Sequence, residues 1–230
     1  MSEDALREAE REAILEAAPF AVAVVLALTA LAVVSAHARW ELFDGVGWWL
    51  WAVTAGAWSL LAVVLLMGLR ATIGPRDVRR RLVETLLGAA VLLSLVQTAL
   101  LVASLVSGSA DELTGPQLLQ SGATLWFANV VAFGLAFWTA DAGGPVRRAM
   151  APTRTHVDFS FPQDSAGIPG DGWAPHLVDY LYVSLTNSIA FSPTDTMPLS
   201  RRAKGMMAVG ALVSAITVLL VAARAVNILG

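Results

Sequence analysis

Apolar residues occur along this chain in long blocks, each about as long as the 20 residues that an α-helix needs to cross a bilayer. Five such blocks are present, at 17–36, 47–69, 82–106, 121–140 and 203–229. Charged residues and prolines gather between the blocks. The pattern therefore predicts an all-α, polytopic membrane helical bundle with five spans.

Composition agrees with this class of protein. Hydrophobic residues make up 57% of the 230 residues and charged residues only 14%, below the roughly 25% of a soluble domain. The chain has no cysteine, and its three histidines lie far apart in sequence. It also lacks a nucleotide-binding glycine loop and the HExxH and Gly-x-Ser-x-Gly motifs. We therefore expect no enzymatic activity, no metal and no cofactor, and a net charge of −3 gives no reason to expect a nucleic-acid partner.

The distribution of basic residues predicts the orientation in the membrane. Five arginines lie between 70 and 81, whereas the loop after the third span carries only Asp111 and Glu112. With a cytoplasmic N-terminus, and with 173–200 returning to the side from which it enters, thirteen basic residues lie inside and two outside. A full crossing by 173–200 would give eleven and four. The positive-inside rule favours the first arrangement, in the plasma membrane.

We divide the chain into four parts. Residues 1–16 predict an acidic N-terminal helix, and 17–140 predict a four-span bundle. Residues 141–172 predict a Gly/Pro-rich cytoplasmic loop, which contains one short extended piece at 156–162. Residues 173–230 predict a module made of a half-helix, a loop and the final span.

The segment 173–204 does not have the pattern of a span. Pro175 suits the first turn of a helix, whereas Pro193 and Pro198 forbid a regular helix after it, and Ser200 can cap a new helix. A half-helix of ~13 residues is about 20 Å long, which passes the middle of the bilayer without crossing it. Irregular backbone at that depth must be buried in protein or line water. We therefore expect the helix to unwind near Asn187 in a re-entrant, pore-type loop.

This loop supplies the candidate site. The residues that we expect to line a pore or bind an ion are Thr186, Asn187, Ser188, Ile189, Ala190, Phe191, Ser192, Thr194, Asp195 and Thr196. The C-terminal end of a half-helix carries partial negative charge, which favours the binding of a cation. Asp195 is either a cation-attracting carboxylate at the mouth or a turn residue that bonds its own backbone.

Other polar residues have more ordinary interpretations. His176 and Asp179 share a helix face and form either an auxiliary proton or ion pair, or an interfacial histidine beside a hydrogen-bonding carboxylate. We expect Gln97, Thr98 and Asn129 to make interhelical hydrogen bonds. Gly210 and Ser214 predict a small face on the last span, which either lines a pore or packs the bundle.

The last 75 residues or so contain, in order, DFSFP, a Gly/Pro-rich stretch, DYLYVSLT, SPTDT and SRRAK before a final helix. This order resembles a family of small bacterial membrane proteins of unknown function. The resemblance implies the bacterial plasma (inner) membrane as the location.

The segment 185–201 also resembles the pore loop of two-transmembrane potassium channels. The positions that coincide with that frame are Leu185, Thr186, Thr196, Pro198, Leu199 and Arg201. Ile189, Ala190 and Phe191 stand where that family has its Gly-Tyr-Gly filter. The resemblance implies a homo-oligomer, a tetramer by analogy, whose loops meet around an axis.

The leading expectation from the sequence is thus an ion channel-like protein in a lipid bilayer, which passes monovalent cations through an oligomeric pore. One alternative is a non-conducting membrane scaffold or interaction subunit. Another is a small transporter, although the first four spans contain no matching interrupted segment.

Overall fold

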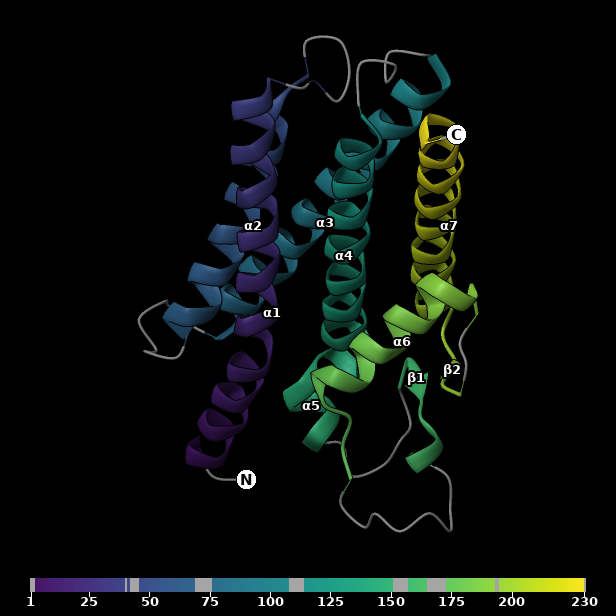
Figure 1. Cartoon of the computed structure of the whole chain (residues 1–230). Helices are drawn as coiled ribbons and strands as arrows, with labels where there is room; N and C mark the ends of the chain where they lie inside the picture. Colours follow the sequence, from purple (N-terminus) through teal and green to yellow (C-terminus); the bar gives the residue numbers. More distant parts are fainter. Residues whose placement is uncertain are drawn as a thin grey trace.

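The computed structural model describes residues 3–39, 41, 46–68, 76–107, 114–150, 157–164, 173–192 and 195–229 (Figure 1). Five of its helices are long and apolar enough to cross a membrane, and the only strands in the described residues are two of two residues each. The chain is therefore an all-α membrane bundle, as its hydropathy predicts. These helices are α1 (Glu3–Ala38), α2 (Trp48–Gly68), α3 (Arg76–Ser107), α4 (Gly115–Ala140) and α7 (Arg201–Leu229).

Shorter elements gather at the end of the bundle that carries the N-terminus (Figure 1). In chain order they are η2 (Asp141–Gly143), α5 (Pro145–Met150), β1 (Phe159–Ser160), η3 (Pro162–Asp164), α6 (Leu177–Ala190) and β2 (Met197–Pro198).

Three helices begin earlier than the apolar blocks alone predict. The acidic extension and the first span form one continuous helix, α1, with Pro19 inside it, because the extension is rich in good helix formers. The arginines from Arg76 onward belong to α3 rather than to a loop. α4 begins at Gly115 because Thr114 and Gln117 form a capping box, in which the Gln117 side chain accepts from the Thr114 amide at 2.8 Å.

α4 occupies the centre of the bundle. It packs against α1, α3, α6 and α7, and α1 and α7 lie on opposite sides of it (Figure 1). Glycines allow close approaches between these helices. A Cβ atom at Gly134 would lie 3.2 Å from the Leu181 Cα atom of α6, and one at Gly210 would lie 3.3 Å from the Phe133 ring. The small face of the last span thus packs the bundle, with Ser214 buried on it.

The expected interhelical hydrogen bonds are present. The Gln97 side-chain amide donates to the Leu50 carbonyl at 3.2 Å and joins α3 to α2. The Asn129 amide lies 3.5 Å from the Thr98 hydroxyl and joins α4 to α3. These bonds use the amide N–H groups of Gln97 and Asn129, which lipid cannot satisfy, so they help to fix the bundle.

The two short strands form an antiparallel pair at the N-terminal end of the bundle. Phe159 lies opposite Pro198 and Ser160 opposite Met197, and the Leu199 amide donates to the Asp158 carbonyl at 2.8 Å. The extended piece predicted at 156–162 forms a strand at Phe159–Ser160, whereas Pro162 already begins the η3 turn. Because β2 pairs there, the chain after α6 returns to the end from which α6 starts.

Candidate functional site

The start of α6 is defined by a local cap. His176 has extended backbone geometry, and its amide donates to the Asp179 carboxylate at 2.8 Å. The sequence predicts Pro175 in the first turn of the helix. In the structure Pro175 lies before the cap residue instead. The structure therefore supports the simpler interpretation of Asp179 as a carboxylate that accepts a backbone hydrogen bond.

His176 has its main side-chain partner on another helix. The Glu16 carboxylate of α1 lies 2.5 Å from His176 Nδ1 and accepts from the Leu177 amide at 2.9 Å. The hydrogen bond that the His176 ring donates to the Glu16 carboxylate raises the pKa of His176 above 6.5, against the smaller opposing effect of burial. The same carboxylate lies at the positive end of α6, where a negative charge is favourable.

α6 runs obliquely across the lower part of α4 and α7 (Figure 1). Its middle is fixed by two side chains that donate to neighbouring helices. The Ser184 hydroxyl donates to the Val130 carbonyl of α4 at 2.8 Å, and the Asn187 amide donates to the Met207 carbonyl of α7 at 2.9 Å. The position of the helix is therefore set by hydrogen bonds as well as by apolar packing.

The prediction that the helix unwinds near Asn187 is wrong. The helix continues to Ala190. The physical reason is that its polar side chains find acceptors without breaking the helix: the Thr186 hydroxyl donates to the carbonyls of Tyr182 and Val183. The turn comes at Phe191, whose φ of 56° places it in the left-handed region.

The predicted lining residues fall into two groups. Asn187, Ser188 and Thr196 are buried, whereas Ile189, Ala190, Phe191, Ser192 and Asp195 are exposed. Thr186 is partly buried and hydrogen-bonded within its helix. Thr194 lies outside the described residues. The structure thus brings an exposed tip, which we define as residues 189–192, and the Asp195 carboxylate to the surface of a single chain.

A groove of about 420 Å³ lies beside this tip, between α4 and α7. Trp126, Ile189, Phe191, Val218 and Val221 are among the residues that line it. The residues that line the groove include no charged side chain, and their polar side-chain groups are the hydroxyls of Ser188 and Thr217 and the indole N–H of Trp126. It suits an apolar occupant rather than a hydrated cation, so one chain does not enclose an ion route along this groove.

Sequence reasoning missed a buried polar network below α6. Asp141 directly follows α4 and is fully buried. One carboxylate oxygen accepts from the amides of Asp158 at 2.6 Å and Phe159 at 3.3 Å, and the other accepts from the Tyr180 hydroxyl at 2.6 Å. The network joins the end of α4, the β1 segment and α6 through a single side chain.

Arg148 of α5 balances this buried charge. Its Nε atom lies 3.4 Å from the Asp141 carboxylate, and its Nη2 atom lies 2.9 Å from that of Asp164. Asp164 in turn accepts from the Phe161 amide at 2.9 Å. The guanidinium contacts both carboxylates, so Arg148 ties the segment 159–164 to the end of α4.

Aromatic rings surround the network and exclude water from it. Phe159 lies 5.2 Å from Phe137 and 6.0 Å from Tyr180, and Phe161 lies 5.2 Å from Tyr180, measured between ring centroids. The alternation in the DFSFP segment is the one local signal of this core, because it directs two phenylalanines to the same side. Nothing in the sequence indicates which acid the arginine pairs with.

Comparisons of the chain with protein families, curated proteins and solved structures gave no match. Among the described residues, no three His, Asp or Glu side chains form a group that could hold a metal ion. The functional assignment therefore depends on the geometry of α6 and the segment that follows it.

Proposed function

We propose that this chain is the subunit of a homo-oligomeric membrane channel that passes small monovalent cations. The tip at 189–192 and Asp195 lie along the conduction path, and α7 lies behind them. The observation that carries this proposal is the return of the chain after α6 to the end of the bundle at which α6 begins.

Both ends of this re-entrant segment are held firmly. The start of α6 is bound by Glu16 of α1, and its first half by Asp141 through Tyr180. The return segment is paired with β1. Fixed flanking elements are what a pore lining requires, because they limit the movement of the groups between them.

The electrostatics of the segment favour cations. Residues 177–200 contain two acidic residues, Asp179 and Asp195, and no basic residue. The exposed tip includes the last two residues of α6, where the free carbonyl groups of a helix carry partial negative charge. The Asp195 carboxylate lies close to this end in sequence and adds a full negative charge at the surface.

An oligomer is part of the proposal because the tip lies at the surface of one chain. The groove beside it is apolar, so a polar route needs tips from several copies around an axis. The resemblance of 185–201 to potassium-channel pore loops favours four copies. Ile189 and Phe191 replace filter glycines in that frame, so we do not propose selectivity for potassium.

A flux assay with purified protein in liposomes tests the function. We expect passage of monovalent cations, and we expect Asp195→Asn to lower the flux by roughly tenfold through loss of local cation attraction. Thr186→Val should also change the flux. Glu84→Gln is the matched control, because Glu84 is an exposed carboxylate that pairs with Arg80 on α3. Absence of flux from intact oligomers would refute the proposal.

The second candidate is a non-conducting membrane scaffold. It is favoured by the burial of Asn187, Ser188 and Thr196 within a single chain, where polar side chains hold the fold rather than face water. Intact oligomers without flux, together with loss of assembly on Asn187→Leu, would support this function instead.

A further inference from the structure

Two arginines from separate helices meet beside one glycine at the end of α4. Gly143 ends η2, and its φ of 83° lies in the region that favours glycine. A Cβ atom at this residue would lie 3.4 Å from Arg147 Nη1 of α5 and 3.7 Å from Arg80 Nη2 of α3. The two guanidinium groups therefore approach a common point from elements that are far apart in the sequence.

These two cations are only partly neutralised. Arg80 Nε lies 2.8 Å from the exposed Glu84 carboxylate of its own helix, which leaves Nη2 facing Gly143. Arg147 is exposed, and no carboxylate of the described residues forms an ion pair with it, whereas its neighbour Arg148 has two carboxylate partners. Because like charges repel each other, the approach of Arg80 and Arg147 to one point favours a bound anion.

The positive-inside rule explains why arginines occur on one side of a membrane. It does not explain why two of them meet, because side chains at a lipid surface are free to separate. Arg81 shows the ordinary case. It is exposed on α3 next to Arg80, and since a helix turns by about 100° per residue, the two side chains leave the helix in different directions.

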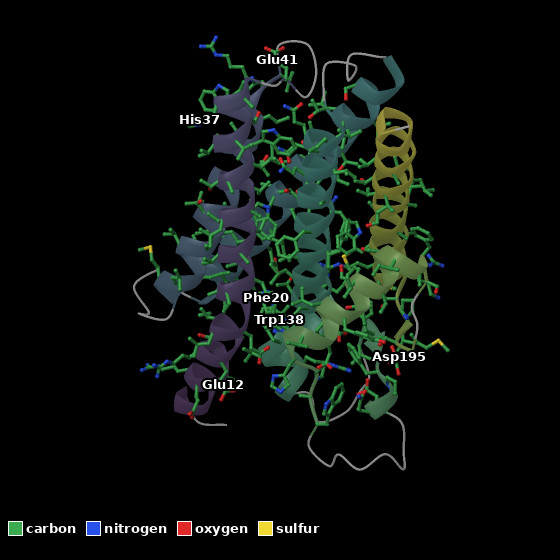
Figure 2. The ribbon with its side chains drawn as sticks, in the orientation of Figure 1. Glu12, Phe20, His37, Glu41, Trp138 and Asp195 are labelled. Carbon is green, nitrogen blue, oxygen red and sulfur yellow. The ribbon has the colours of Figure 1, made fainter. Side chains whose placement is uncertain are left out.

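The position of this point along the bundle indicates the source of the anion. The apolar span of α3 begins at Arg80, and that of α4 ends at Gly143. Figure 2 shows Trp138, which precedes η2, toward this end of the bundle, whereas His37 and Glu41 lie at the opposite end. Both arginines therefore lie where the hydrocarbon layer gives way to the headgroups, which is the level of the phosphate groups of lipids.

We propose that Arg80 and Arg147 bind the phosphate group of one anionic phospholipid beside Gly143. A guanidinium group suits a phosphate, because its planar N–H groups donate to two oxygen atoms at once. A headgroup with a net negative charge is favoured over a zwitterionic one, because two arginines repel an ammonium group. The bound lipid connects the start of α3 to the end of α4, whether or not the chain conducts ions.

Native mass spectrometry of the purified full chain in detergent tests this site. Phosphatidylglycerol is titrated against the natural chain and the variants, with phosphatidylcholine as the zwitterionic lipid. We expect one phosphatidylglycerol molecule to be retained per chain. Arg80→Gln and Arg147→Gln should each weaken its binding about tenfold, because each removes charge-assisted hydrogen bonds to the phosphate. Arg81→Gln is the matched control: it removes the same charge from the same helix and should weaken binding less than about twofold.

A second readout keeps loss of the site apart from loss of the fold. Without added lipid, the double variant Arg80→Gln/Arg147→Gln should unfold cooperatively on heating, as the natural chain does. Added phosphatidylglycerol should raise the unfolding midpoint of the natural chain and leave that of the double variant unchanged.

Three results would overturn the proposal. Equal losses from Arg81→Gln and Arg147→Gln would show attraction by general surface charge rather than a site. Equal retention of phosphatidylcholine would show that no anionic headgroup is recognised. A rise of the midpoint with inorganic phosphate alone, without retention of lipid, would assign the point to free phosphate instead.

Discussion

The hydroxyl group of Tyr180 donates to the carboxylate of Asp141 across 2.6 Å, and so ties α6 to the residue that ends α4. A carboxylate at the C-terminal end of a helix is poorly placed, because the helix end already carries partial negative charge. Asp141 is tolerated there because two backbone amides, the phenol and Arg148 surround it. The buried Asp141 carboxylate, whose charge Arg148 balances, thus holds the helix that carries the candidate site.

Removal of the phenol should cost stability. Tyr180→Phe deletes one donor to a buried carboxylate, so we expect the free energy of unfolding to fall by about 1–3 kcal/mol. Thermal unfolding in detergent measures this change. Tyr182→Phe is the matched control, because Tyr182 is 48% exposed on the same helix, and it should have little effect. Equal losses from the two variants would show that the contact with Asp141 contributes nothing specific.

Removal of the guanidinium should cost more. Arg148→Met leaves Asp141 buried without a cation, and loss of one partner from a buried ion pair costs about 3–5 kcal/mol. We expect the unfolding midpoint in detergent to fall well below that of Arg147→Met, because Arg147 is exposed on the same short helix. The double variant Arg148→Met/Asp141→Asn should recover part of the loss. No recovery would mean that the arginine acts through packing rather than charge.

Hydropathy and proline placement predicted much of the fold. The five spans, the half-helix, the extended piece before it and the start of α7 near Ser200 all follow from local patterns, and the Ser200 hydroxyl accepts from the Ala203 amide at 3.0 Å. Such features depend on neighbours within a few residues, so a single sequence contains them. The extent of α6 was predicted less well, because the side chains of Thr186 and Asn187 find acceptors that the pattern does not reveal.

The polar contacts that position the site were beyond reach of the sequence. Tyr180 and Asp141 are 39 residues apart, and His176 and Glu16 are 160 apart. Pairing at such separations is set by how the helices pack, and no local period encodes it. The helical spacing places His176 beside Asp179, the nearest acid on its own helix, whereas the side-chain partner of His176 lies on α1.

Stability should depend on the protonation of His176. Glu16 raises its pKa above 6.5, so the protonated form is the one that the folded state favours. The stabilisation is complete below about pH 6.5 and is lost as the pH rises through the raised pKa. We expect the difference in melting temperature between the natural chain and His176→Gln to shrink from about pH 6 to about pH 9. A difference that stays constant across this range would contradict the link, and Glu16→Gln should abolish the dependence in the same way.

The close approach of α4 and α6 can be tested at a glycine. A Cβ at Gly134 would lie 2.6 Å from Leu181 Cδ2 and 3.2 Å from Leu181 Cα, whereas one at Gly88 on α3 would meet nothing within 4 Å. Gly134→Ala should therefore push α6 away from α4 and cost about 1–3 kcal/mol. Gly88→Ala should instead stabilise its helix by up to about 1 kcal/mol, because alanine is the better helix former. Unfolding in detergent distinguishes the two variants, and equal effects would place α6 farther from α4.

If the tip at 189–192 lies along an ion path, Gly134→Ala should also alter cation flux while Gly88→Ala leaves it unchanged, because only the first substitution moves the helix that carries the tip.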